Sequence, residues 1–592
     1  MDLSTRSGRR EQGLRIQGAI ERAGMSAEEL AGRVGCSRAL VYQYLSGATL
    51  AQPDRLQRIA SVCGVDLALF YQDDGPDVRR TPPPDVEDRL RSSLEALEAL
   101  AQAQQSPADL HAAASACQQA LTLAQQLNDT GARIRAFHRL GATRLALAEY
   151  PEAVEALSQA VSLSASSGDA GAEIAARQCL GAALISLGRD ADAEAEFVRT
   201  SAGPTVSGRW RGTLSLGGIA EMRGDYATAM ARFDDVAAML EDAATAGELS
   251  AAELATGLLY VNMNRTNVYL DGGDFEGART LAQQCLVDAE SLGIAAQGLE
   301  ARFNLAWCDF ATGTLADSWR GLLALRQLAR FLGDGGREAF ANAWLAILLS
   351  AAGDADASVT CGKEGLAQAL ATGDRRAELY AQLGLADSYS ADVRRRNEAR
   401  YHATQALAVT VSQRQERGEI ECRLRLARLA ALEANRADLE HQASLALAAA
   451  HRLGARHLEC IAMVWSGNSR LAASDVPEAE RLGASANDLA REIGSAEGIW
   501  RSHSLLAASA ARRGDTTAQE QHLRSSVDML ESLRAQLRIA GLPDTLMENG
   551  ECLTVYAELL AVLRAAGRDD AVAELLELAA WPPLADEPGA IR

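Results

Sequence analysis

Apolar residues recur at intervals of three and four over most of the chain, which is the spacing of amphipathic helices. Two such helices, with a break at Gly224, lie within residues 214–236, LSLGGIAEMRGDYATAMARFDDV. The second helix presents Ala229, Phe233 and Val236 on one face. Because an isolated helix pair cannot bury that face, the pattern predicts further pairs on both sides of this one.

Equivalent helix pairs follow at a nearly constant spacing. The steps from Gly273 to Gly313 and from Gly313 to Gly353 are both 40 residues, and each of these glycines stands where Gly224 stands in its pair. A fixed period of this size is typical of a solenoid of stacked helix pairs. The sequence therefore predicts an all-α array in which each repeat contacts its immediate neighbours, so that the array can flex like a spring.

The repeated motif has a leucine, a small residue, a glycine turn, an aromatic residue and spaced alanines, and it resembles the tetratricopeptide repeat. That repeat is usually about 34 residues long, whereas the spacing here is near 40. The resemblance is weakest at 418–450, where residues 433–435 replace the turn glycine. It implies a tetratricopeptide-like superhelix of about eleven to twelve helix pairs over residues 89–580, followed by a frayed tail at 581–592.

The N-terminal segment has a different pattern, with five short predicted helices separated by glycine turns. Ser26, followed three residues later by Glu29, is the signature of a capping box at the start of the second helix. Gly35 provides the next turn, and Ser37 is placed to cap a third helix over residues 38–45. A tight turn between the second and third of several short helices describes a helix-turn-helix domain.

This segment resembles the Cro/repressor-like (XRE) family of DNA-binding domains over almost its whole length. The matching positions include Ser26, Leu30-Ala31, Gly35, Ser37, Val41, Gly47, Pro53, Ile59-Ala60 and Gly64-Val65. The resemblance implies that residues 1–71 bind double-stranded DNA, with the third helix in the major groove. The expected DNA contacts on that helix are Ser37, Arg38, Ala39, Tyr42 and Gln43.

Side-chain chemistry agrees with that expectation for two of these residues. Gln43 can pair with adenine through two hydrogen bonds, and Arg38 can bind guanine or a phosphate. The alternative is that the same residues form an ordinary solvated helix face, and N-capping alone would account for Ser37.

Charge is divided unevenly along the chain. The formal net charge is −21, yet residues 1–64 hold nine arginines and six acidic residues, a net of +3, so the remainder carries −24. A basic N-terminal module on an acidic body favours DNA binding by the module alone. Between the two, residues 72–88 include the run Pro82-Pro83-Pro84 and are expected to form a stiff, extended linker.

No catalytic or metal-binding motif stands out. His457-x-x-Cys460 lacks two further ligands in sight, and the sequence around Lys363 lacks the spacing of a phosphate-binding loop. The ten cysteines form no C-x-x-C pair and are expected to be buried free thiols. The N-terminus shows no apolar signal segment, and no apolar run is long enough to cross a bilayer. We therefore expect a cytoplasmic protein that is not an enzyme, holds no metal and needs no cofactor.

A second candidate site is the inner wall of the array, because first helices line the concave face in tetratricopeptide proteins. The polar residues expected there are Asn264, Asn267, Arg302, Asn304, Asn342, Tyr380 and Gln382. Side-chain amides on such a wall can hold a peptide backbone through paired donor and acceptor bonds. Trp307, Phe310, Phe340 and Trp344 could form pockets between them. The alternative places the asparagines on exposed faces and the aromatic residues in the core between repeats.

The combination of an XRE-type head and a repeat array resembles the bacterial peptide-pheromone-receptor regulators. It implies a homodimeric transcription regulator in which the array binds a signalling peptide and modulates operator binding. One alternative is an adaptor whose array binds a folded protein partner and recruits it to DNA. Another is a scaffold whose head no longer binds DNA.

Overall fold

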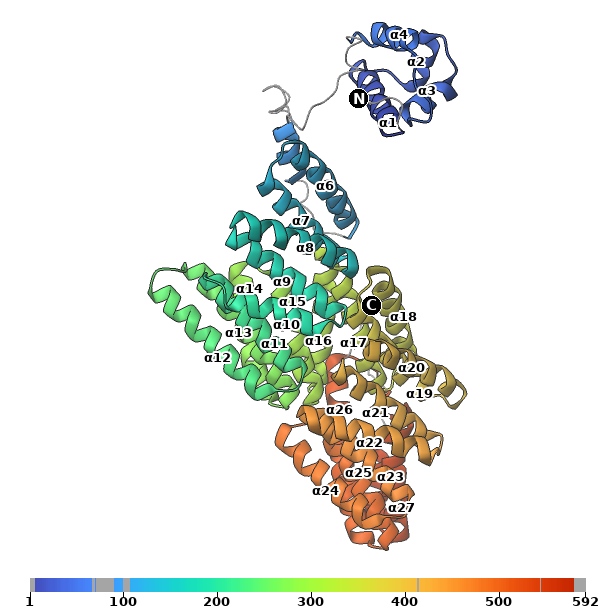
Figure 1. Ribbon diagram of the computed structural model, residues 1–592. Coiled ribbons are helices and arrows are strands. Elements are labelled where there is room, and N and C mark those ends of the chain that lie inside the picture. Colours follow the sequence, from blue (N-terminus) through green and yellow to red (C-terminus); the bar gives the residue numbers. More distant parts are fainter. Residues whose placement is uncertain are drawn as a thin grey trace, which may run out of the picture. The chain divides into compact units, whose positions relative to one another are not determined.

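The computed structural model describes residues 6–65, 70, 90–98, 107–147, 149–412, 415–543 and 545–579. These residues form helices and short connections and include no strand. The chain divides into two compact units, Met1–Arg89 and Leu90–Arg592 (Figure 1). Apart from Phe70, the fifth helix expected in the head lies outside the described residues, as do the linker at 72–88 and the tail at 581–592.

The N-terminal unit contains four described α-helices packed around one core. They are α1 (Arg6–Arg22), α2 (Ala27–Val34), α3 (Arg38–Leu45) and α4 (Pro53–Cys63). Ile16, Leu30 and Leu56 are fully buried between them. The predicted capping box is present at the start of α2, where the Ser26 backbone N–H donates to Glu29 over 2.8 Å and the Glu29 N–H donates to the Ser26 hydroxyl over 3.2 Å.

The second unit is a stack of antiparallel helix pairs. Its first half contains α6 (Pro107–Gln126), α7 (Thr130–Ala146), α8 (Tyr150–Ser167), α9 (Ala170–Ser186), α10 (Asp190–Ser201), α11 (Val206–Met222), α12 (Tyr226–Thr245), α13 (Ala251–Gly272), α14 (Phe275–Leu292), α15 (Ala295–Ala311), α16 (Leu315–Leu332), α17 (Gly335–Ala351) and α18 (Ala355–Thr372).

The second half continues in the same way. It contains α19 (Arg375–Ser390), α20 (Arg396–Ser412), α21 (Glu416–Leu432), α22 (Arg436–Leu453), α23 (Arg456–Ala472), α24 (Val476–Ile493), α25 (Ala496–Arg513), α26 (Thr516–Ala540), α27 (Gly550–Ala565) and α28 (Asp569–Ala579), with short 3₁₀ turns at Val393–Arg395 and Leu546–Glu548. Consecutive helices pack on each other along the whole array, which confirms the predicted all-α solenoid.

One contact between the two helices of a pair recurs along the first half of the array. A Cβ atom added to Gly141, Gly181 or Gly217 of the first helix would lie 2.3–2.4 Å from the large side chain of the second helix, which is Leu157, Phe197 or Phe233 respectively. Only glycine therefore lets the two helices approach this closely. The small residue and the large apolar residue of the sequence motif are the two sides of this contact.

Most turns within the pairs share one conformation, with the 3₁₀ turn between α19 and α20 as an exception. Gly224 has a φ of 75° and is followed by Asp225, whose carboxylate accepts a hydrogen bond from the Thr228 N–H over 3.1 Å and so caps α12. The repeat that lacks the glycine keeps this turn, because Ala434 adopts a φ of 55°. Ser474 does the same two helices later, with a φ of 64°. The period thus continues through the region where the sequence signal is weakest.

Repeats that are far apart in the sequence also contact each other. The prediction of a spring-like array, in which each repeat contacts only its immediate neighbours, is therefore wrong. Helix α16 packs against α26 (Figure 1). The turn glycines of the first half also meet later parts of the chain, because Gly224 lies against Leu453, Gly273 against Ile493 and Gly353 against Thr545. These partners are 229, 220 and 192 residues apart in the sequence. One superhelical turn therefore packs directly on the next.

Packing of one superhelical turn on the next predicts different effects for substitutions at two turn glycines. An alanine at Gly353 (φ 89°) would place its Cβ 1.9 Å from the Thr545 carbonyl oxygen, whereas an alanine at Gly514 (φ 74°) would meet nothing within 4 Å. Both variants carry the backbone strain of alanine at positive φ, roughly 1–2 kcal/mol. Only Gly353→Ala must also displace the segment around Thr545, so its melting temperature should fall further.

Hydrogen exchange checks where the structure opens. In Gly353→Ala, the backbone amides of residues 545–565 should lose protection against exchange. In Gly514→Ala, the exchange of the same amides should not change. Equal melting temperatures and equal protection in the two variants would contradict the closure between turns.

Candidate functional site

Helix α3 presents all five predicted DNA contacts on its solvent side. Ser37, Arg38, Ala39, Tyr42 and Gln43 are exposed. The opposite face of the helix is anchored in the core of the head by the buried Val41 and Tyr44. The Ser37 hydroxyl accepts a hydrogen bond from the Leu40 N–H over 3.3 Å, so this residue caps the helix as well as lying on its exposed side.

Arg38 and Tyr42 form one cluster with a carboxylate of the preceding helix. Arg38 makes an ion pair with Glu28 of α2, and its guanidinium lies 5.9 Å from the centre of the Tyr42 ring. The Tyr42 hydroxyl donates to the same carboxylate over 3.3 Å. Glu28 therefore partly neutralises the charge of Arg38. A phosphate or base that binds Arg38 would have to replace Glu28 as its partner.

A cavity of about 1830 Å³ lies inside the array and is lined by residues from Leu110 to Leu453. Three of the seven predicted ligand residues, Asn267, Asn304 and Tyr380, line it. They belong to α13, α15 and α19, which are first helices of their pairs, and this is the wall on which the sequence placed them.

Aromatic side chains line one wall of this cavity and contact one another. The Trp344 ring centre lies 5.3 Å from that of Phe303 and 5.0 Å from that of Tyr380. The guanidinium of Arg376 lies 4.3 Å from the centre of the Phe340 ring and donates a 3.0 Å hydrogen bond to Glu300. The wall thus offers flat apolar surfaces beside a fixed positive charge.

Two polar groups of the cavity wall have no partner among the described residues. Asn304 is 1% exposed, and its amide nitrogen makes no hydrogen bond there. Glu221 of α11 lines the same cavity without a hydrogen bond or ion pair to a described residue. Burial raises the pKa of Glu221 to about 7, even though the nearby Arg417 and Arg376 oppose that shift. A buried polar group without a partner is costly, so the Asn304 amide marks a place where a ligand would gain a hydrogen bond, and the partly exposed Glu221 carboxylate lies in the same wall.

The other four predicted ligand residues do not line this cavity, because other parts of the chain hold them. Asn264 donates to the Tyr260 carbonyl over 2.8 Å, and Arg302 pairs with Glu290 over 2.5 Å. The two remaining residues are buried. Asn342 bonds to Arg326 and Gln368, and Gln382 bonds to His402. These contacts use the amides to join helices within the array.

Sequence reasoning missed Glu221 and Arg376. The available signal for Glu221 was its position three residues after Gly218, on the inner side of a first helix. Arg376 gave no comparable signal, because an arginine at the start of α19 resembles the many arginines on the surface.

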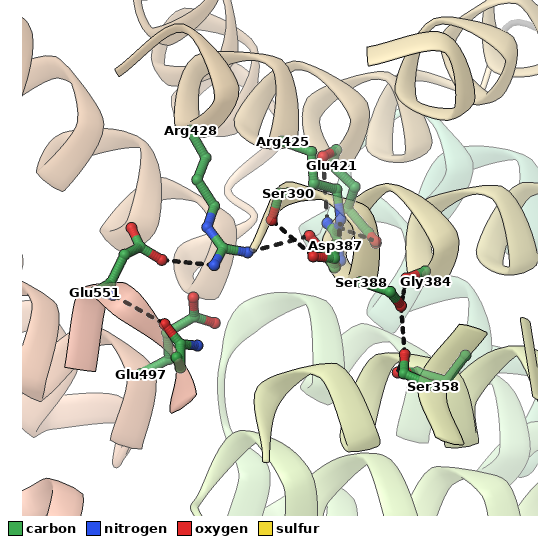
Figure 2. A network of polar contacts seen from close by, with 12 residues as sticks. Ser358, Gly384, Asp387, Ser388, Ser390, Glu421, Arg425, Arg428, Glu497 and Glu551 are labelled. Atoms are coloured by element: carbon green, nitrogen blue, oxygen red, sulfur yellow. Dashed lines mark hydrogen bonds and ion pairs between the residues drawn. The ribbon is translucent and has the colours of Figure 1, made fainter. Parts of the chain in front are cut away.

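A network of charged side chains joins helices of the array that are far apart in the sequence (Figure 2). Arg428 of α21 bridges Asp387 of α19 over 3.5 Å and Glu551 of α27 over 2.7 Å. Arg425 donates to Asp387 over 3.1 Å, and Arg501 of α25 pairs with Glu551 over 3.2 Å. We call these five residues the polar clamp.

The polar clamp keeps the Glu551 carboxylate ionised. Burial alone would raise the pKa of Glu551, but the charges of Arg428 and Arg501 outweigh it and lower that pKa to about 2. The side chains of Arg428 and Glu551 are only 15% and 17% exposed. The clamp therefore ties α27 to the middle of the array by charge as well as by packing.

Other kinds of site are not visible in the described parts of the chain. No three His, Cys, Asp or Glu side chains there are placed to hold a metal ion. In the same residues, no helix combines the length and apolar character needed to cross a membrane. The ten cysteines are free thiols, and most of them are buried.

Comparison with known proteins gives a family match for the N-terminal unit. Residues 13–70 match the family described as a helix-turn-helix domain. No curated protein matches the chain.

Solved structures similar to this chain are distant in sequence. The Rap protein complexed with Competence and Sporulation Factor is 12% identical, with 62% of this chain and 99% of that one covered and a TM-score of 0.40. The apo form of the quorum sensor NprR from B. thuringiensis is 12% identical, with 64% and 100% covered and a TM-score of 0.35. The APC/C hetero-tetramer Cut9-Hcn1 is 13% identical, with 83% and 93% covered and a TM-score of 0.45.

The geometry and the family match together confirm two sequence predictions. The chain carries a helix-turn-helix domain near its N-terminus, and a tetratricopeptide-like α-solenoid follows it.

The polar clamp predicts unequal costs for removing two arginines. Arg428→Met leaves Asp387 and Glu551 buried with less compensation, which should lower the free energy of unfolding by roughly 3–5 kcal/mol. Arg481→Met removes an ion pair with Glu478 in which the side chains are 62% and 36% exposed, and this should cost about 0–1 kcal/mol. Chemical denaturation measures both, and equal losses would show that the clamp adds nothing beyond a surface ion pair.

Proposed function

We propose that this protein is a DNA-binding transcription regulator whose array senses a peptide and thereby modulates operator binding. The observation that carries the proposal is the exposed face of α3, which offers an arginine, a tyrosine and a glutamine from a helix-turn-helix domain. The local net charge of +3 over residues 1–64, in a chain of net charge −21, supports binding of DNA by this unit alone.

Base reading by α3 follows from the chemistry of two side chains. In the proposed complex, Arg38 exchanges its ion pair with Glu28 for a guanine or a phosphate, and Gln43 pairs with adenine. Ser37 and Tyr42 have hydroxyls suited to phosphate contacts, and Ala39 leaves room for the groove floor. An XRE-type mode of docking fits this arrangement.

The size of the inner cavity favours a peptide as the ligand. Sites for small molecules usually enclose about 300–1,000 Å³, and this cavity measures about 1830 Å³. Its wall combines contacting aromatic rings with the amides of Asn267 and Asn304, which suit apolar side chains and a peptide backbone respectively. A folded protein partner is less suitable, because the contacts between superhelical turns would have to open to admit it.

Coupling of the two units would follow from closure of the array. A peptide that contacts α13, α15 and α19 at once would stabilise one arrangement of these helices at the expense of others. Helix-turn-helix proteins commonly read two half-sites about 34–36 Å apart as dimers. We propose that this protein also acts as a homodimer, so that a change in the array alters how two heads are presented.

The DNA-binding half of the proposal predicts the effect of two substitutions. Arg38→Ala and Gln43→Ala should each weaken operator binding by roughly 1–3 kcal/mol if the side chains read bases. Gln17→Ala is the matched control, because the exposed Gln17 lies on α1 and its amide donates to Glu21 of the same helix. Binding is measured by fluorescence anisotropy on an operator fragment selected from genomic DNA. Unchanged affinity and footprint in both α3 variants would rule out this recognition helix.

The sensing half predicts that the paired substitution Asn267→Ala with Asn304→Ala abolishes the ligand's effect on operator affinity. Helical content, oligomeric state and affinity without ligand should not change, since neither residue belongs to the head. The control is Asn468→Ala, which alters an amide outside this cavity. Operator affinity is measured with and without the peptide fraction of a host extract. A full response in the double variant would place the sensor elsewhere in the array.

A further inference from the structure

A second cavity, of about 180 Å³, lies where the two superhelical turns meet. Helices α15 and α17 of the earlier turn face α21, α23, α25 and α26 of the later one across it. Trp307 and Trp344 form a wall shared with the larger cavity, while Trp465 and Trp500 line the second cavity but not the larger one. The space is therefore rich in aromatic surface and small enough to enclose its occupant.

The charged groups around this cavity already satisfy one another. Its wall includes three carboxylates and three guanidiniums, namely Asp387, Glu421, Glu497, Arg425, Arg428 and Arg501. Arg425 bonds to Asp387, Arg428 also reaches Asp387, and Arg501 donates to Glu497 over 2.7 Å. With equal numbers of opposite charges paired in this way, the wall has no excess charge to attract an ion.

Three nitrogen atoms in this wall lack a hydrogen-bond partner. They belong to side chains that are neutral or whose charge is already paired. Trp344 Nε1, Arg428 Nε and His457 Nδ1 are buried and make no hydrogen bond with a described residue. The indole and guanidinium nitrogens can only donate. Trp344 is 5% exposed, so solvent does not supply its missing acceptor. Burial lowers the pKa of His457 to about 4, which keeps that ring neutral at pH 7.

We propose that this second cavity binds a small uncharged molecule with an apolar, ring-sized body and a carbonyl-type hydrogen-bond acceptor. The acceptor satisfies the Trp344 N–H group, and the body packs on the tryptophan rings. A cavity of about 150 Å³ can hold benzene, so there is room here for a single ring and one polar substituent. The site shares Trp307 and Trp344 with the larger cavity, but its remaining lining residues belong to the joint between turns, so it does not require that a peptide bind in the larger cavity.

Binding at this joint would stabilise the closed array. The occupant contacts α17 of the earlier turn and both α21 and α23 of the later one, and a ligand that binds only the folded form raises its stability by mass action. The expected signature is a rise in melting temperature that depends on ligand concentration.

The first test uses the unmodified full-length protein and four probes of similar size. Acetophenone should bind saturably, with a Kd on the order of 1 mM or tighter, and should raise the melting temperature. Ethylbenzene, which lacks the acceptor, should bind at least tenfold more weakly, and so should benzoate and benzylammonium, which carry charge. Ligand-observed NMR and thermal denaturation measure both effects. Absence of acetophenone binding, or equal binding of ethylbenzene, overturns the proposal.

The second test locates the probe. Trp344→Phe should weaken acetophenone binding about tenfold, because it removes the N–H donor but keeps an aromatic ring. Trp210→Phe alters a buried tryptophan that lines neither cavity, and Asn304→Ala alters only the larger cavity, so neither should change the Kd. Circular dichroism confirms folding of each variant. If Asn304→Ala weakens binding, acetophenone occupies the larger cavity and the proposal fails; an unchanged Kd in Trp344→Phe overturns it as well.

Discussion

Close packing of one superhelical turn on the next is the constraint on which the rest of the array depends. It is made possible by the turn glycines, whose lack of a side chain lets Leu453, Ile493 and Thr545 approach backbone atoms directly. A stack of helix pairs without this contact would leave its inner face open to solvent. With it, the inner face becomes an interior, where polar groups must be paired and aromatic groups can be buried.

Both the polar clamp and the two cavities are consequences of that enclosure. Arg428 can reach Asp387 and Glu551 together only because α27 lies beside the middle of the array (Figure 2). The pKa values follow the same logic. Glu551, which is paired with two arginines, is held ionised, whereas burial raises the pKa of Glu221, which lies near Arg417 and Arg376 but bonds to no described residue, to about 7. Enclosure therefore separates polar groups that hold the fold from polar groups that are left for a ligand.

The sequence predicted the features that depend on residues close together in the chain. It did not predict the contacts between residues that are far apart in the chain. Helix pairs, turns and the capping box of Ser26 and Glu29 depend on residues a few positions apart, and these were predicted correctly. The pitch of the superhelix depends on small rotations between pairs that no local pattern records, so contact between Gly353 and Thr545 could not be foreseen. The same limit explains Asn342 and Gln382, which the first-helix pattern placed on the groove wall but which are buried between helices.

The separation of the closing contacts along the chain also determines the order in which the array can form during synthesis. Helix pairs through α18 can stack as soon as they leave the ribosome, because each needs only the pair before it. The partners of Gly224, Gly273 and Gly353 are 192–229 residues further on and do not yet exist at that stage. A nascent chain consequently passes through a stage in which its inner wall is open, and it seals that wall only when α22 to α27 arrive. A molecule present at that stage can enter without having to force the finished turns apart.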